Sequence, residues 1–132
     1  MLGDIAVQTM LPVRSLEAAE KFYEEKLGLK RMGDEPGAAV KYRSGNSTLC
    51  VYRSEFAGTN QGTAALWEVD DVEGTVKELR ARGVTFEQYD NLPAVIRKGD
   101  VHHAGDIQVA WFKDPDGNIL SIQNKPARPG RS

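Results

Sequence analysis

Two adjacent histidines, His102 and His103, carry the side chains best suited to acid–base chemistry near neutral pH. Neighbouring side chains on a β-strand point to opposite faces, so on a strand the pair could not hold one ion between them. In a loop, both rings could simply be solvated. We therefore treat each histidine as a candidate ligand contact and assign neither to a metal.

Three other polar residues could take part in chemistry. Cys50 would need a nearby base to act as a nucleophile, and none is visible, so a small buried apolar role is simpler. Ser121 is not surrounded by a Gly-x-Ser-x-Gly motif and is expected to line a cavity or to bond to the backbone. Gln8 falls in a stretch predicted as a buried strand, where its amide must bond either a ligand or its neighbours.

The first half of the chain predicts one helix among four strands. Ser15 is the expected N-cap of the helix, and Gly28 follows the last residue of its apolar stripe. β-Branched and apolar runs predict the strands, and Ser-Gly-Asn-Ser at 44–47 predicts a hairpin turn. The strands are expected at residues 5–13, 29–32, 38–43 and 48–53.

A Gly-, Thr- and Asn-rich stretch at 54–63 predicts a linker, and the same pattern then begins again. A helix is expected after Asp70 or Asp71, with Asp70 and Glu73 resembling a capping box and Gly83 ending the helix. Residues 91–104 are not assigned and could form a lid. The remaining strands are expected at 64–69, 84–88, 107–112 and 118–124, the last two forming a hairpin around an Asp-Pro-Asp-Gly turn.

The chain therefore contains an internal repeat, because residues 13–17 align with residues 69–73. Each unit has the order βαβββ. One unit alone would leave a sheet face uncovered, so we expect two units to pack together and their sheets to curl around a cleft.

Composition limits the class of protein. The chain has 132 residues and a net charge of −2, and its pI near 5.7 argues against nucleic acid as a partner. A single cysteine favours a reducing compartment. Neither a signal peptide nor an apolar run long enough to span a membrane is apparent, so a cytoplasmic protein is expected.

Four segments together resemble the vicinal oxygen chelate superfamily, which includes glyoxalase I, bleomycin-resistance proteins, fosfomycin-resistance enzymes and extradiol dioxygenases. They are Leu-Pro-Val at 11–13, Phe-Tyr-Glu-Glu-Lys-Leu-Gly-Leu at 22–29, Glu-Val-Asp-Asp at 68–71 and Phe-Lys-Asp-Pro-Asp-Gly-Asn at 112–118. The resemblance implies an α+β fold of two βαβββ modules that form a curled mixed sheet around a cavity, usually in a homodimer. We expect a single domain over 1–132, with module 1 at 5–53, the linker at 54–63, module 2 at 64–124 and a mobile tail at 125–132.

The resemblance also indicates where metal enzymes of this superfamily place their ligands. These positions correspond here to Gln8, Cys50, Ala64 and Ser121. Alanine has no donor atom, and a serine hydroxyl is a poor ligand beside a carboxylate. No cofactor is therefore predicted, and a divalent metal is the alternative.

The favoured hypothesis is a glyoxalase/bleomycin-resistance-like protein that binds a small organic molecule without the metal centre. The alternatives are an enzyme, namely a metal-dependent or non-standard lyase, isomerase or dioxygenase of the same superfamily, and a dimeric scaffold. Expected partners are a small organic ligand and a second copy of the chain, with neither nucleic acid nor membrane. No catalytic residue is assigned, and the candidate ligand contacts are Gln8, Met10, Cys50, Tyr52, Leu66, His102, His103, Trp111, Ser121 and Gln123.

Overall fold

The computed structural model describes residues 1–125, so the predicted tail at 125–132 lies outside the described residues except for its first. The chain forms two compact units, which are described separately. The first comprises 1–64 with 114–119, and the second comprises 65–113 with the chain from 120 onward. Among the described residues, no helix is both long and apolar enough to cross a bilayer.

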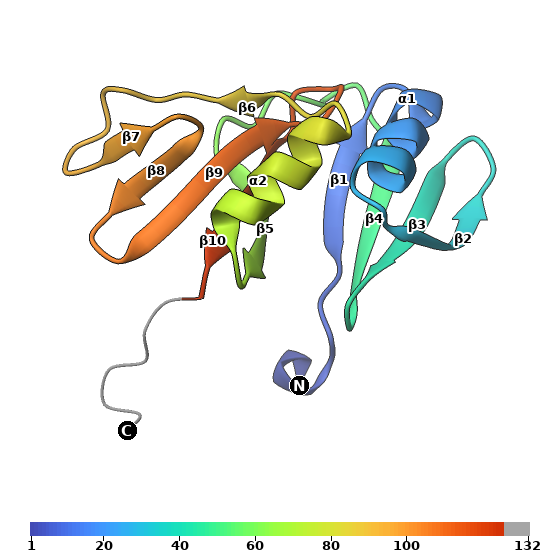
Figure 1. The fold of residues 1–132 in the computed structure, drawn as a ribbon. Helices are drawn as coiled ribbons and strands as arrows, with labels where there is room; N and C mark the ends of the chain where they lie inside the picture. Colours follow the sequence, from blue (N-terminus) through green and yellow to red (C-terminus); the bar gives the residue numbers. More distant parts are fainter. Residues whose placement is uncertain (126–132) are drawn as a thin grey trace. The chain divides into compact units, whose positions relative to one another are not determined.

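The first unit has the predicted order of one strand, a helix and three strands (Figure 1). Its sheet has the order β1-β4-β3-β2, with β1 parallel to β4 and the other pairs antiparallel. The helix covers one face of β3 and β4, where the apolar side chains are buried. After the short turn η1 (Leu2–Asp4), the elements are β1 (Thr9–Val13), α1 (Leu16–Glu20), the π-helix η2 (Lys21–Lys26), β2 (Lys30–Glu35), β3 (Ala39–Ser44) and β4 (Ser47–Arg53).

The second unit is built on a longer sheet of order β5-β10-β9-β8-β7, with β6 paired to β9. Its first strand lies beside its last, as in the first unit. The face that α2 packs on buries Phe86, Ala110 and Phe112. The elements are β5 (Thr63–Val69), α2 (Val72–Ala81), β6 (Phe86–Glu87), β7 (Ile96–Lys98), β8 (Val101–Ala104), β9 (Ile107–Lys113) and β10 (Ile119–Asn124).

Helix starts and ends follow local capping chemistry. Ser15 Oγ accepts a hydrogen bond of 3.1 Å from Ala18 N–H, as predicted. Gly28 and Gly83 follow the two helices with φ of 74° and 95°, a conformation that favours glycine. The predicted capping box at Asp70 is wrong, because Asp71 is the N-cap and its carboxylate accepts from Gly74 N–H at 3.0 Å.

The α+β class and the two-sheet organisation are confirmed, whereas several strand limits differ. The strand expected at 5–13 begins only at Thr9, and the strand expected at 84–88 is reduced to β6. The unassigned segment 91–104 contains the hairpin of β7 and β8, which turns at Gly99 with φ of 64°. A shared cavity between the modules remains a prediction.

Candidate ligand-binding site

Three predicted ligand contacts in the first unit share one face of its sheet. Met10 pairs with Cys50, and Tyr52 lies two residues further along β4. The intervening Val51 points to the helix-covered side, so Met10, Cys50 and Tyr52 lie on the opposite side. We call this side the open face. Met10 is 51% exposed there, whereas Cys50 is only 3% exposed.

Cross-strand pairing extends the open face to charged residues. Lys41 pairs with Cys50, and Ala39 pairs with both Tyr52 and Glu35. Burial raises the pKa of the Cys50 thiol, Lys41 opposes this shift, and Glu35 adds to it. The thiol is therefore held in its neutral form, which is unfavourable for a nucleophile.

A pocket of about 840 Å³ opens at the Tyr52 end of this face. A smaller hollow of about 190 Å³ continues from it toward Lys41 and shares Glu35 and Ala39 with it. The size of the larger pocket is within the range of small-molecule sites. Its lining residues are Arg14, Glu35, Gly37, Ala38, Ala39, Tyr52, Arg53, Ser54 and Glu55.

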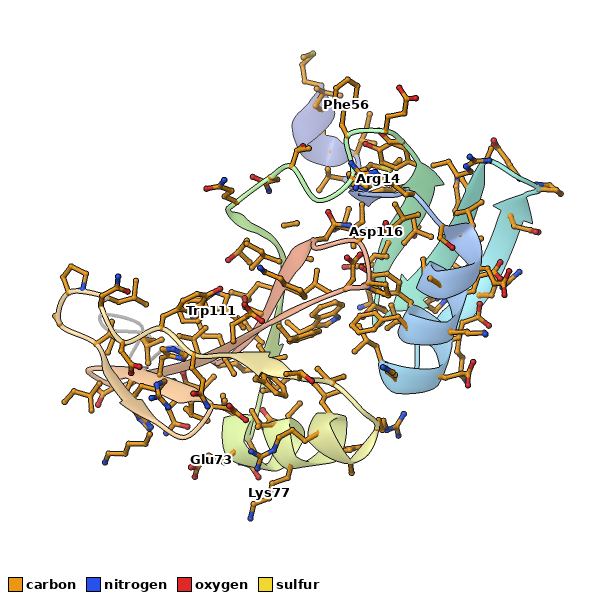
Figure 2. All side chains as sticks on the ribbon, turned by 90° about the horizontal axis from the view of Figure 1, so that it is seen from above. Arg14, Phe56, Glu73, Lys77, Trp111 and Asp116 are labelled. Atoms are coloured by element: carbon orange, nitrogen blue, oxygen red, sulfur yellow. The ribbon has the colours of Figure 1, made fainter. Side chains whose placement is uncertain are left out.

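Arg14 is fixed at the rim of the pocket by the loop that follows β4. Its Nη2 donates a hydrogen bond of 3.1 Å to the backbone oxygen of Glu55. The next residue, Phe56, is an exposed aromatic side chain on the same loop (Figure 2). In the part of the chain that the structure describes, neither Arg14 nor Arg53 forms an ion pair.

The prediction that Gln8 sits in a buried strand is wrong. Gln8 is exposed and precedes β1, because the chain from the turn η1 to residue 8 makes no ladder with β4. Its amide therefore needs no protein partner.

In the second unit, His102 is fully buried in an aromatic cluster. Its Nε2 accepts a hydrogen bond of 2.9 Å from Tyr89 N–H, so that nitrogen carries no proton. The ring lies edge-on to Trp111 at 4.8 Å and beside Tyr89 at 5.7 Å. Nδ1 of His102 has no hydrogen-bond partner among residues 1–125. The Tyr89 hydrogen bond and the Trp111 contact therefore hold His102 as a structural ring in the core.

The neighbouring His103 points the other way. It pairs with Gln108, and its strand face continues to Val101 and Ala110 on the helix side of the sheet. The two histidines thus lie on opposite faces, as strand alternation predicted.

The remaining candidates lie on β5 and β10. Leu66 is 46% exposed, whereas Ser121 is 1% exposed. Ser121 and Gln123 alternate with Leu120 and Ile122, so the two pairs lie on opposite faces of β10.

The structure thus groups the candidates within each unit. Met10, Cys50 and Tyr52 form one group, and His102 with Trp111 forms another. Sequence reasoning missed Arg14, Glu35, Lys41 and Tyr89. Alternation along residues 38–43 and the hairpin turn at 44–47 could have placed Lys41 beside Cys50, whereas Tyr89 carried no comparable signal.

The positions that correspond to the superfamily's metal ligands do not fit a metal centre here. Ala64 offers no donor, Ser121 offers only a hydroxyl, and Gln8 is exposed outside the strand. Within residues 1–125, no three His, Cys, Asp or Glu side chains form a group that could hold a metal ion.

The sequence profile of the glyoxalase/bleomycin resistance protein/dioxygenase superfamily matches residues 5–122. The chain belongs to this superfamily. A relative named probable lactoylglutathione lyase, from Vibrio parahaemolyticus, is 30% identical over 94% of this chain and 94% of its own length.

Solved structures of the superfamily have the same fold. TnmS3, an antibiotic binding protein from Streptomyces sp. CB03234, is 25% identical with a TM-score of 0.63 and covers 93% of this chain and 98% of its own. A bleomycin-binding protein in complex with bleomycin is 17% identical with a TM-score of 0.67, covering 91% and 98%. The superfamily and fold are therefore established, and the predicted resemblance is confirmed.

Proposed function

We propose that this superfamily member binds a small organic molecule on the open face of the first sheet and does so without a metal centre. The observation that carries the proposal is the donor set at the superfamily's metal positions, where Ala64 and Ser121 replace ligating side chains. The antibiotic-binding protein TnmS3, at 25% identity, supports binding as a function of this fold.

The open face offers the features that such a site requires. Tyr52 supplies an aromatic wall beside the pocket of about 840 Å³, and Met10 supplies a flexible apolar surface. A few charged groups at the rim can orient a ligand, as polar groups do in apolar pockets. The site therefore favours a planar or partly aromatic molecule.

Elemental analysis of protein purified without added metal tests the first part of the proposal. We expect far less than one equivalent of zinc, nickel, iron or manganese per chain. About one equivalent of any of these would overturn the metal-free binding site.

Isothermal titration calorimetry with a library of planar organic molecules tests the second part of the proposal, which is binding on the open face. We expect Tyr52→Ala to weaken the best binder by about tenfold, since stacking on an aromatic ring typically contributes about 1 kcal/mol or more. Lys77→Ala is the matched control, because Lys77 is exposed on α2 of the second unit (Figure 2). Equal affinities in both variants would exclude Tyr52 from the site, and a library without any binder would favour the scaffold alternative.

Enzymatic activity is a second candidate function, favoured by the 30% identity to a probable lactoylglutathione lyase. Turnover of lactoylglutathione should be measured with each divalent metal supplied. If a histidine acts as acid or base, His102→Ala or His103→Ala should lower turnover by about 10²-fold or more. Unchanged turnover in both variants would remove histidine from the reaction.

We also propose that the chain forms a homodimer in a reducing, cytoplasmic compartment. The superfamily resemblance supports the dimer, and the single cysteine supports the compartment. Sedimentation equilibrium and cell fractionation test these two points.

A further inference from the structure

Four charged residues line the pocket of the first unit and form no ion pairs with the rest of residues 1–125. Arg14 lies at one side, where β1 and β4 end beside each other. Arg53 also borders the pocket, but it alternates with Tyr52 and pairs with Val13, so its side chain is on the helix-covered side. Glu35 lies on β2 and Glu55 on the loop after β4. None of the four has a salt-bridge partner within the described chain, residues 1–125.

The sheet order separates Arg14 from Glu35. From β1 to β2 the sheet crosses β4 and β3, which gives three inter-strand gaps, or about 14 Å at about 4.8 Å per gap. Tyr52 and Ala39 pair between these charges and form the floor of the pocket. The pocket therefore has the Arg14 guanidinium at one end, next to the loop that carries Glu55, and the Glu35 carboxylate at the other, with an aromatic surface between.

The side chains are available for a ligand. Arg14 donates one hydrogen bond from Nη2 to the Glu55 backbone oxygen, which holds the guanidinium at the rim. Its other N–H groups have no hydrogen-bond partner within residues 1–125 and can meet a ligand. Glu35 pairs with Ala39, which pairs with Tyr52, and it lines both hollows, so its side chain is on the open-face side of the sheet. Arginine favours planar carboxylates because its donors form a rigid fork, whereas a carboxylate favours an ammonium group.

We propose that this pocket selects ligands that carry a carboxylate and an amine at opposite ends of an aromatic core. The carboxylate lies against Arg14, the amine against Glu35, and the ring against Tyr52. This inference rests on the proposed binding function and adds the chemical class of the ligand.

Four matched probes test the proposal by isothermal titration at neutral pH and low salt. They share a naphthalene ring and carry a carboxylate and an aminomethyl group at opposite ends, the carboxylate alone, the aminomethyl group alone, or a neutral carboxamide. We expect the probe with both charges to bind most tightly, by about fivefold for each charge, since exposed ion pairs contribute up to about 1 kcal/mol.

Single charge-neutralising variants assign each end of the pocket. Arg14→Gln should remove the preference for the carboxylate, and Glu35→Gln should remove the preference for the amine. The matched controls are Arg43→Gln and Glu25→Gln, because both residues are exposed and line neither hollow. These controls should leave all four affinities unchanged.

Three results would overturn the proposal. The carboxamide could bind as tightly as the doubly charged probe, the pocket variants could retain the wild-type preferences, or no probe could bind at millimolar concentration. A neutral library molecule that binds through Tyr52 would then leave the binding function standing. One equivalent of bound metal per chain would instead contradict the proposed metal-free function, whereas the measured preference of the pocket for charged probes would still stand.

Discussion

Tyr23 donates a hydrogen bond of 2.8 Å from its phenol to Oδ2 of Asp114, which lies 91 residues further along the chain. Asp114 is buried and accepts three more bonds, from Asn118 Nδ2 and from the N–H groups of Asp116 and Asn118. Asn118 Nδ2 also donates to Pro12 O at 2.7 Å. The Asp-Pro-Asp-Gly-Asn turn thus connects η2 and β1 of the first unit. This structural role accounts for the buried carboxylate of Asp114 without any catalytic role.

Tyr23→Phe should lower the free energy of unfolding by about 1–3 kcal/mol, because it leaves a buried carboxylate oxygen short of a donor. Urea denaturation measures this loss. Tyr52→Phe is the matched control and should change stability by less than about 0.5 kcal/mol, since its hydroxyl has no partner among residues 1–125. Equal losses in both variants would contradict the role of the Tyr23 bond.

The stability of the protein should fall above about pH 10. Burial, followed by the charge of Asp114, raises the pKa of Tyr23 above its ordinary value of 10.0. Below pH 10 the phenol is protonated in both states, so the stabilisation is fully present. As the pH rises further, the unfolded state loses the proton first and is favoured by about 1.4 kcal/mol per pH unit.

Denaturation between about pH 9 and pH 11 tests this linkage by the difference between two proteins. Wild type should lose stability more steeply than Tyr23→Phe, which lacks the titrating phenol. Lysines and the other tyrosines titrate in both proteins and cancel in the comparison. Parallel curves would show that Tyr23 has the same pKa in both states.

Asp71→Ala should cost about 1 kcal/mol of unfolding free energy, because it removes the cap of the Gly74 N–H at the start of α2. Asp70→Ala is the control. Its carboxylate is exposed and forms a surface ion pair of 3.4 Å with Lys125, so the loss should stay below about 0.5 kcal/mol. A larger loss of unfolding free energy in Asp70→Ala than in Asp71→Ala would instead support the capping box at Asp70 that the sequence predicted.

Local chemistry explains what the sequence predicted well. The caps at Ser15, Gly28 and Gly83 and the turn at 114–117 depend on residues a few positions apart, and all can be recognised from type and spacing. Strand alternation correctly placed Cys50 and Tyr52 on one face, because residues two apart on a strand share a face whichever strand lies beside them.

Long-range arrangement explains what the sequence missed. The bond between Tyr23 and Asp114 and the place of Arg14 at the pocket depend on the packing of distant segments, which no local pattern encodes. Gln8 was wrongly assigned to a buried strand because the apolar run at 5–13 begins before Thr9, the first residue of β1 that pairs with β4. The strand β7 lacked a signal because Ile96 is largely exposed at the sheet edge and only three residues pair.

Gly58→Ala should destabilise the first unit more than a glycine substitution in open space. Gly58 has φ of 75°, and an added Cβ would clash with the backbone oxygen of Asp116. We expect a loss of about 2–4 kcal/mol, which combines backbone strain with overpacking. Gly37→Ala is the control with a similar φ of 78° and nothing within 4 Å, so it should cost only about 1–2 kcal/mol. Equal losses would mean that the loop moves freely away from the turn.

His102→Ala should cost about 2–4 kcal/mol of unfolding free energy, because it opens a cavity beside Trp111 and leaves the Tyr89 N–H without an acceptor. His103→Ala is the neighbouring control. Its ring forms no hydrogen bond among residues 1–125 and is only partly buried, so we expect a loss of about 1 kcal/mol or less. Thermal and urea denaturation measure both losses. A larger loss of unfolding free energy in His103→Ala than in His102→Ala would contradict the assignment of His102 as the buried structural histidine. An unchanged unfolding free energy in His102→Ala would show that another group accepts the hydrogen bond from the Tyr89 N–H.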